Sequence, residues 1–179
     1  DDELIKIAVK SMGLDELGSF NPSEKIIEYK MADQNNRRLV RMSLESFSRE
    51  TASESPAPGG GSVSAYLGSL GAALATMVAN LSSHKRGWDD RWDEFSDWAE
   101  KGKCYHENLC SLVDEDTRAF NYIMEAFSLP KSNAEEKEER KKSIAKATKY
   151  AIEVPYKVMQ AAYGSMEVIK AMADIGNPN

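Results

Sequence analysis

The chain has 179 residues and a formal net charge of -6, and 41% of its residues are hydrophobic. This length accommodates one good-sized domain with its own core, or one domain and a fragment of another. The acidic balance argues against nucleic acid as a main partner, because nucleic-acid phosphates bind basic surfaces. It still permits a small anionic ligand, since local positive charge is sufficient for that.

Cysteine and histidine are too sparse to indicate a metal site. Cys104 and Cys110 lie six residues apart, which matches no zinc-ligand spacing, and the two histidines are His84 and His106. No secretory signal pattern opens the chain. We therefore expect no metal, reduced thiols and a cytoplasmic protein.

A run of prolines and glycines precedes the longest uncharged stretch: Pro56, Ala57, Pro58, Gly59, Gly60, Gly61 and Ser62. Each proline fixes its own φ and favours extended geometry in the residue before it. The glycines allow the backbone to come close to whatever lies opposite. Ser62 then opens a helix whose first amide groups have no intrahelical partner, so this end can receive an anionic or electron-rich ligand group. The alternative is a glycine linker before a core helix.

Residues 59–83 carry no charge and are numerous enough to span a bilayer, although polar residues interrupt them. Two faces recur at helical spacing. One has large residues and the other has small residues: Leu67, Leu70, Leu74, Val78 and Leu81, against Ala65, Gly68, Ala72, Ala75 and Ala79. A helix that is apolar all round is typical of the middle of a bundle, and small residues permit close approach of another helix, within the subunit or from a second one. We expect no membrane span.

Apolar residues continue at a spacing of three to four over residues 92–127 and again over 144–172, which predicts further helices. Gly102 is a candidate break in the first of these helices. Pro155 predicts a kink or a break in the second, because proline lacks the backbone N–H that a helix interior uses.

The last helix has recognisable start and stop signals. Ser132 or Asn133 can cap its start, and Gly176 is expected to end it. No segment after residue 40 shows strand alternation. The sequence therefore predicts an all-α, up-and-down helical bundle with a buried Gly/Ala-rich central helix.

One carboxylate interrupts an apolar face. Asp116 shares a helix face with Leu112 and Phe120, where an unpaired carboxylate would be costly. It is therefore a candidate acid/base group or a hydrogen-bond partner for a ligand nitrogen. The alternative is a structural ion pair with a cation from another helix. Asp114 pairs plausibly with Arg118, one helical turn later.

Two cations, Lys85 and Arg86, directly follow the uncharged helix. At a helix C-terminus they favour the helix dipole, which is a purely structural role. They could equally hold the carboxylates of a ligand.

Together these residues resemble the formiminotetrahydrofolate cyclodeaminase family, which also contains bacterial methenyltetrahydrofolate cyclohydrolases. The resemblance covers roughly residues 43–179. It begins with the Pro56–Ser62 run and its small-residue helix. It continues through Asn80, Lys85, Arg86, Asp114, Asp116, Ala119, Phe120, Leu129, Pro130, Lys131, Glu135, Glu136, Lys137, Val154, Pro155, Gly176 and Asn177.

An upstream segment resembles the end of a glutamate formiminotransferase domain: Phe20, Asn21, Pro22, Glu24, Lys25, Ile26, Ile27, Glu28 and Tyr29. We expect residues 1–40 to be the remnant of such a domain plus a linker, and residues 41–179 to be the cyclodeaminase-like helical domain. Both ends of the chain look like cuts, and the family continues past Asn179 with a further segment. The resemblance thus implies part of a bifunctional enzyme.

The chemistry that the resemblance implies is cyclisation of 5-formiminotetrahydrofolate to 5,10-methenyltetrahydrofolate with loss of ammonia, an ammonia-lyase step in one-carbon metabolism and histidine breakdown. Asp116, with Asp114 as the second candidate, would be catalytic. Substrate binding would fall to Lys85, Arg86 and the loop residues Pro58, Gly59, Gly60, Gly61 and Ser62. Family members dimerise through helices, so a homodimer or higher homo-oligomer is expected. No cofactor is needed beyond the folate substrate, including its polyglutamylated forms.

Two other functions remain open. A methenyltetrahydrofolate cyclohydrolase would use the same scaffold to add water. A non-catalytic module would hold folate or join subunits.

Overall fold

A computed structural model describes residues 2–14, 16, 18, 20–27 and 38–178. The chain divides into two compact units, Asp1–Ser43 and Leu44–Asn179, which are described separately.

The first unit contains α1 (Asp2–Ser11), α2 (Pro22–Lys25) and the 3-10 helix η1 (Leu39–Arg41). Val9 is buried in it. Glu28 and Tyr29, the last residues of the segment that resembles a formiminotransferase, lie outside the described residues.

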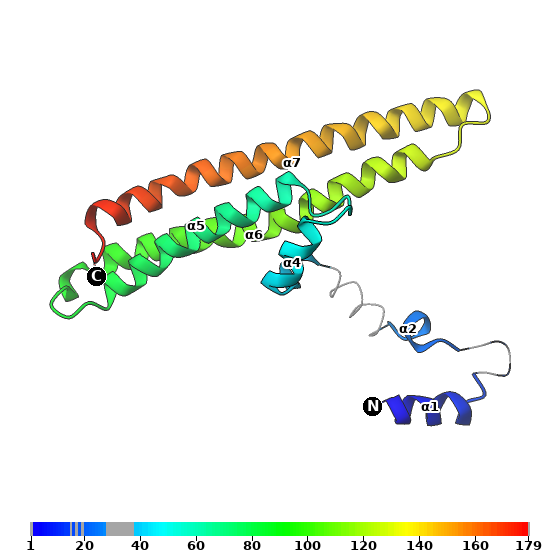
Figure 1. Ribbon diagram of the computed structural model, residues 1–179, viewed down its shortest axis with the longest axis horizontal. Helices are drawn as coiled ribbons and strands as arrows, with labels where there is room; N and C mark the ends of the chain where they lie inside the picture. Colours follow the sequence, from blue (N-terminus) through cyan, green and yellow to red (C-terminus); the bar gives the residue numbers. More distant parts are fainter. Residues whose placement is uncertain (1, 15, 17, 19, 28–37, 179) are drawn as a thin grey trace. The chain divides into compact units, whose positions relative to one another are not determined.

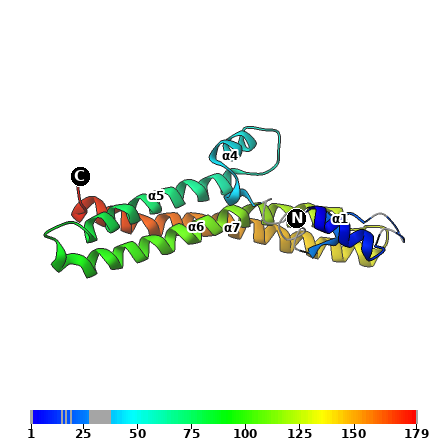
Figure 2. The same ribbon diagram turned by 90° about the horizontal axis from the view of Figure 1, so that it is seen from below.

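The second unit contains the long helices, and its elements are α4 (Leu44–Thr51), α5 (Gly60–Ser83), η2 (Asp89–Arg91), α6 (Trp92–Ser128) and α7 (Ala134–Ile175). Helices α5, α6 and α7 pack against one another and alternate in direction along the chain (Figure 1 and Figure 2). The predicted all-α up-and-down bundle is confirmed, because the described residues form helices and no strands.

Helix α5 is placed by its small residues. Small side chains let it lie close to both α6 and α7, so it contacts each of the other long helices. The buried residues of α5 are Ser62, Ala65, Ser69, Ala72, Ala75, Ala79, Ser82 and Ser83.

The large residues of α5 lie on the surface of the single chain. Their side chains are between 42% and 63% exposed, and they recur at alternating spacings of three and four: Leu67, Leu70, Leu74, Met77 and Leu81. We call these five residues the leucine stripe. Burial of α5 is thus one-sided, because among the described elements α6 and α7 make most of its contacts, and α4 adds a ring contact between Phe47 and Tyr66.

Among the described helices, α5 is the one that is long and apolar enough to cross a membrane, a property that core helices of soluble proteins share. Because its small-residue face packs on two helices that carry many charged residues, we interpret α5 as a bundle helix.

Helices α6 and α7 are each continuous, so the breaks expected at Gly102 and Pro155 do not occur. Gly102 serves packing instead, since a Cβ atom there would lie 2.4 Å from Oγ1 of Thr76 on α5. Pro155 removes one N–H from α7. The flanking Val154 and Val158 are nonetheless buried in the bundle, which holds the helix together across the proline.

The start and end predicted for α7 are confirmed. The side chain of Asn133 accepts a hydrogen bond from the backbone N of Glu136 at 2.8 Å, and Oε2 of Glu136 accepts one from the backbone N of Ser132 at 2.7 Å. These two bonds satisfy amides that the helix itself cannot. Gly176 is the C-cap, and its N–H donates to the carbonyl of Met172.

Candidate functional site

The N-terminus of α5 is capped by a side chain from α6. The N-cap residue of α5, Gly59, has no side chain with which to accept from the first amides. Instead, Oδ2 of Asp116 accepts hydrogen bonds from the backbone N of Ser62 at 2.8 Å and from its Oγ at 3.0 Å. A carboxylate here satisfies an amide that lacks an intrahelical partner, and it lies at the positive end of the helix dipole.

The two helices meet this closely because residue 61 is glycine. A Cβ atom on Gly61 would lie 2.1 Å from Oδ1 of Asp116, which no real structure allows. A Cβ atom on Gly60 would meet nothing within 4 Å. The glycine run therefore permits close approach of the backbone to the Asp116 carboxylate.

Ser62 is fully buried between α5 and α6. Its Oγ lies within hydrogen-bond distance of two acceptors, the backbone carbonyl of Val113 at 2.9 Å and Oδ2 of Asp116 at 3.0 Å, and 3.4 Å from Oγ1 of Thr117. All of these partners belong to α6, so the hydroxyl is engaged with that helix.

A cavity of about 230 Å³ opens beside Asp116. Asp116 is the one titratable residue in its described lining. The lining residues come from the glycine segment, α6 and α7: Pro56, Ala57, Gly59, Gly60, Gly61, Asp116, Thr117, Ala119, Phe120, Ile123 and Ala151. We call this space the glycine–aspartate cavity. It combines backbone groups at a helix N-terminus with a carboxylate in largely apolar walls, an arrangement suited to binding a polar group and exchanging a proton with it.

Two other predicted site residues lie near this cavity in sequence but are absent from its lining. Asp114 precedes Asp116 by two positions on α6, which places it on a different side of the helix. It is partly buried. Pro58 is buried.

Lys85 and Arg86 lie beyond the opposite end of α5, whose 24 residues extend for about 36 Å. The Nζ atom of Lys85 donates to Oδ1 of Asn177 at 3.0 Å and lies 4.2 Å from the ring centroid of Trp88. These contacts agree with a structural role for Lys85, whereas Arg86 is exposed. Within one chain, the two cations and the glycine–aspartate cavity do not come together.

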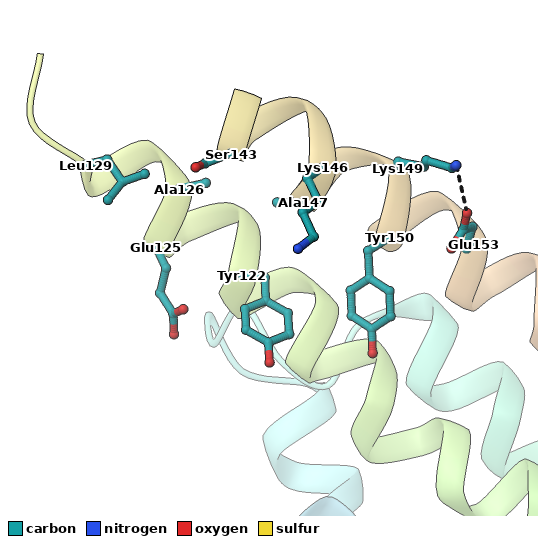
Figure 3. A pocket seen from close by; sticks show the side chains of 10 residues that line it. All are labelled: Tyr122, Glu125, Ala126, Leu129, Ser143, Lys146, Ala147, Lys149, Tyr150 and Glu153. Carbon is teal, nitrogen blue, oxygen red and sulfur yellow. Dashed lines mark ion pairs between the residues drawn. The ribbon is translucent and has the colours of Figure 1, made fainter. Parts of the chain in front are cut away.

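A larger hollow of about 820 Å³ lies between the C-terminal half of α6 and the N-terminal half of α7 (Figure 3). Tyr122 and Tyr150 line it with their ring centroids 5.8 Å apart. Lys149, also in the lining, is paired with Glu153 at 3.8 Å. We place the candidate site in the smaller cavity, because the Asp116 carboxylate and the glycine-lined start of α5 meet there.

Sequence reasoning did not single out Glu115, which lies between the two aspartates. Its Oε1 accepts a hydrogen bond from the hydroxyl of Tyr150 at 2.9 Å and lies 3.7 Å from Nζ of Lys157. Partial burial and this hydrogen bond raise the pKa of Tyr150 above its ordinary value. The signal available in the sequence was the row of three acidic residues at 114–116. Adjacent residues of a helix point in different directions, so Glu115 reaches α7 whereas Asp116 reaches α5.

No metal-ligand group of three or more His, Cys, Asp or Glu side chains gathers within the described ranges. Cys104 and Cys110 are free thiols. The donors at the glycine–aspartate cavity are carboxylate, hydroxyl and backbone groups, which suit hydrogen bonding and proton exchange.

Residues 43–179 match the family model described as Formiminotransferase-cyclodeaminase, and residues 1–32 match the Formiminotransferase domain. The formimidoyltransferase-cyclodeaminase of Gallus gallus is 39% identical over 99% of this chain and 33% of its own length. The methenyltetrahydrofolate cyclohydrolase of Methylorubrum extorquens is 33% identical over 76% of this chain and 65% of its own length. The chain thus spans about a third of the length of its bifunctional relatives.

A solved structure, that of formiminotetrahydrofolate cyclodeaminase from Thermotoga maritima, resembles this fold with a TM-score of 0.63 and 31% sequence identity. The likeness covers 76% of this chain and 64% of that one.

We expect Gly61→Ala to destabilise the protein by about 1–3 kcal/mol, because the added methyl group must displace the Asp116 carboxylate. Gly60→Ala is the matched control, since it adds the same methyl group to open space one residue earlier. It should leave stability unchanged or raise it by up to about 1 kcal/mol through helix propensity. Urea unfolding measures both, and equal free energies of unfolding would contradict this account.

We expect Glu115→Gln to lower the pKa of Tyr150 toward its ordinary value, because the carboxylate accepts the hydroxyl proton and disfavours the phenolate. NMR titration of ¹³Cζ-labelled tyrosine measures the change. Glu107→Gln is the control, since Glu107 pairs with Lys103 at 3.7 Å elsewhere on α6. An unchanged Tyr150 titration in Glu115→Gln would show that the hydrogen bond has no such effect.

Proposed function

Since the chain belongs to the formiminotransferase-cyclodeaminase family, whose model matches residues 43–179, we propose that it converts 5-formiminotetrahydrofolate to 5,10-methenyltetrahydrofolate and ammonia. The observation that carries this proposal is the Asp116 carboxylate, held at a glycine-lined helix N-terminus and facing a small cavity. The reaction would serve one-carbon metabolism and histidine breakdown. It would take place in the cytoplasm, where free thiols are typical.

We further propose that the domain works within a bifunctional enzyme. Residues 1–32 match a formiminotransferase domain, and relatives about three times as long as this chain carry both activities in their names. A transferase domain on the same polypeptide would supply the formimino substrate directly to residues 41–179.

Asp116 is suited to the proton transfers of ring closure. N10 of the folate attacks the formimino carbon and loses its proton, and the amino group must gain a proton before it leaves as ammonia. One carboxylate beside the reacting bridge can accept the first proton and deliver the second. In its charged form it also stabilises the cationic methenyl product. No cofactor takes part in these steps. Asp114 is the second candidate for this role.

The size of the glycine–aspartate cavity limits what it holds. Ligand pockets usually enclose about 300–1,000 Å³, and this cavity has about 230 Å³. It would therefore receive the reacting end of the folate, with Gly59, Gly60 and Gly61 against the bridge. The rest of the substrate would extend outside it.

A second candidate function is hydrolysis of methenyltetrahydrofolate, favoured by the similarity to a cyclohydrolase that this chain covers over 65% of its length. Addition of water to the methenyl carbon needs a proton acceptor at the same bridge, so Asp116 would serve that reaction as well. A folate-holding or assembly module without catalysis is the third possibility.

We expect Asp116→Asn to lower kcat at least about 100-fold, because the amide cannot exchange a proton. Its carbonyl oxygen can still accept from the Ser62 amide, so the helix cap is retained. Methenyltetrahydrofolate absorbance and ammonia release are followed together with 5-formiminotetrahydrofolate as substrate. Asp114→Asn is the comparison and should keep most of the activity.

The outcomes of this assay separate the functions. Hydrolysis of methenyltetrahydrofolate without ring closure by the unmodified protein would support the cyclohydrolase. Inactivity in both assays would leave the non-catalytic module, and a loss confined to Asp114→Asn would transfer the catalytic role to that residue.

We propose that two chains pair through the leucine stripe. Five exposed apolar side chains at alternating spacings of three and four form the pattern by which helices pair in coiled coils. The whole of α5 is uncharged, so a second copy of the same helix meets no like-charge repulsion. A homodimer would bury the stripe from water.

An antiparallel pair of α5 helices centred on Leu74 would also reunite the predicted site residues. In such a pair, residue 86 of one copy would lie beside residue 62 of the other, although the two positions are at opposite ends of α5 within one chain. Lys85 and Arg86 would then lie beside the partner's cavity, where they could hold the glutamate tail of the folate, including polyglutamate.

Complementation between subunits tests this arrangement. We expect a mixture of Asp116→Asn chains and Lys85→Ala/Arg86→Ala chains to regain activity, because half of the mixed dimers' sites would contain both intact groups. Each variant alone should be impaired. Absence of recovery after demonstrated subunit exchange would show that Lys85 and Arg86 do not serve the partner's cavity, and a monomer in analytical ultracentrifugation would refute the pairing itself.

A further inference from the structure

We propose that Ser62 is a positioning residue whose hydroxyl holds Asp116 in place both when the carboxylate is charged and when it is protonated. The inference rests on the proposed function for its catalytic meaning. The family resemblance implies substrate binding by Ser62, but its side chain is fully buried and Ser62 is absent from the lining of the cavity.

A serine hydroxyl has one proton to donate and two lone pairs with which to accept. The Oγ atom of Ser62 has two acceptors at nearly equal distance, the carbonyl of Val113 at 2.9 Å and Oδ2 of Asp116 at 3.0 Å. It can satisfy one of them fully at any moment.

The two acceptors of the Ser62 hydroxyl correspond to the charged and the protonated forms of Asp116. When Asp116 is charged, the hydroxyl donates to Oδ2 together with the Ser62 amide, and the carboxylate has two donors. When Asp116 gains a proton, the hydroxyl can turn its own proton to the Val113 carbonyl and accept from the acid. No proton leaves Ser62 in this exchange, and no heavy atom needs to move.

Burial makes this adaptability important. A buried hydroxyl without an acceptor costs on the order of 1–3 kcal/mol, and Ser62 is fully buried. With its two acceptors, the hydroxyl remains satisfied in either state of Asp116. The backbone amide of Ser62 provides the fixed contact, and the hydroxyl provides the adjustable one.

The described lining of the cavity contains no other charged side chain that could hold Asp116 in place of Ser62. Helix α5 carries no charged residue, and from α7 only Ala151 lines the cavity. On α6 itself, Glu115 is turned to Tyr150 and Lys157 on α7, Asp114 lies on another side of the helix, and Arg118 is exposed.

Ser69 offers a matched control on the same helix. It is also fully buried, and its Oγ donates to the carbonyl of Tyr66 within α5. Ser69→Ala therefore removes a buried hydroxyl that has no contact with Asp116. Ser62→Cys is the second test variant, because its thiol occupies nearly the same space as the hydroxyl but is a weak donor.

The experiment compares Ser62→Ala, Ser62→Cys and Ser69→Ala in the intact protein. We expect both Ser62 variants to lower kcat about 10- to 100-fold, the worth of one hydrogen bond to a charged group, with little change in KM. The carboxyl signal of Asp116, followed by NMR in protein with ¹³Cγ-labelled aspartate and assigned with Asp116→Asn, should move in both Ser62 variants, because the carboxylate loses a hydrogen-bond donor. Ser69→Ala should change neither quantity.

Two results would overturn the inference. One is an Asp116 carboxyl signal in both Ser62 variants that coincides with that of the unmodified protein. The other is an equal effect of Ser69→Ala, which would show that loss of any buried hydroxyl from α5 suffices. The NMR comparison decides the matter even if the unmodified protein closes no ring, so failure of the proposed function remains distinguishable.

Discussion

The bonds from the first turn of α5 to Asp116 are the constraint on which the rest of the site depends. An N-cap side chain is normally supplied by the residue just before the helix, but here that residue is Gly59, and the cap comes from Asp116, 54 residues after the Ser62 whose amide it accepts from. These hydrogen bonds therefore fix the position of the start of α5 along the length of α6. Because Gly61 leaves no room for a Cβ atom there, the separation of the two helices is set as well.

This single contact links folding to chemistry. The carboxylate that caps the start of α5 is the same group that lines the glycine–aspartate cavity. The contacts that hold the cap therefore also position the candidate catalytic group. Outside this end, the bundle is stabilised by small side chains packed between long helices, and it leaves the leucine stripe exposed. The chain is thus well ordered around its candidate acid–base group while one face of the same helix is still available for a partner.

Much of the fold could be read from the sequence, because helical periodicity and capping signals act locally. Asn133 and Gly176 mark the ends of α7 as predicted. The unusual position of Asp116 on an apolar face was also visible. The hydrogen bonds between Asp116 and Ser62 were not visible, since contacts between distant segments leave no local sequence pattern. The same cause explains why no break occurs at Gly102 or Pro155: tertiary packing keeps α6 and α7 continuous through these residues.

The proline in α7 has a consequence for the opposite wall of the cavity. The N–H that Pro155 lacks is the one that would have bonded to the carbonyl of Ala151, four residues earlier. Ala151 is the α7 residue that lines the cavity. The α7 residue in the wall of the cavity is thus also the one whose backbone carbonyl has lost its usual intrahelical donor, and the proline places that gap in the helix at the level of the candidate site.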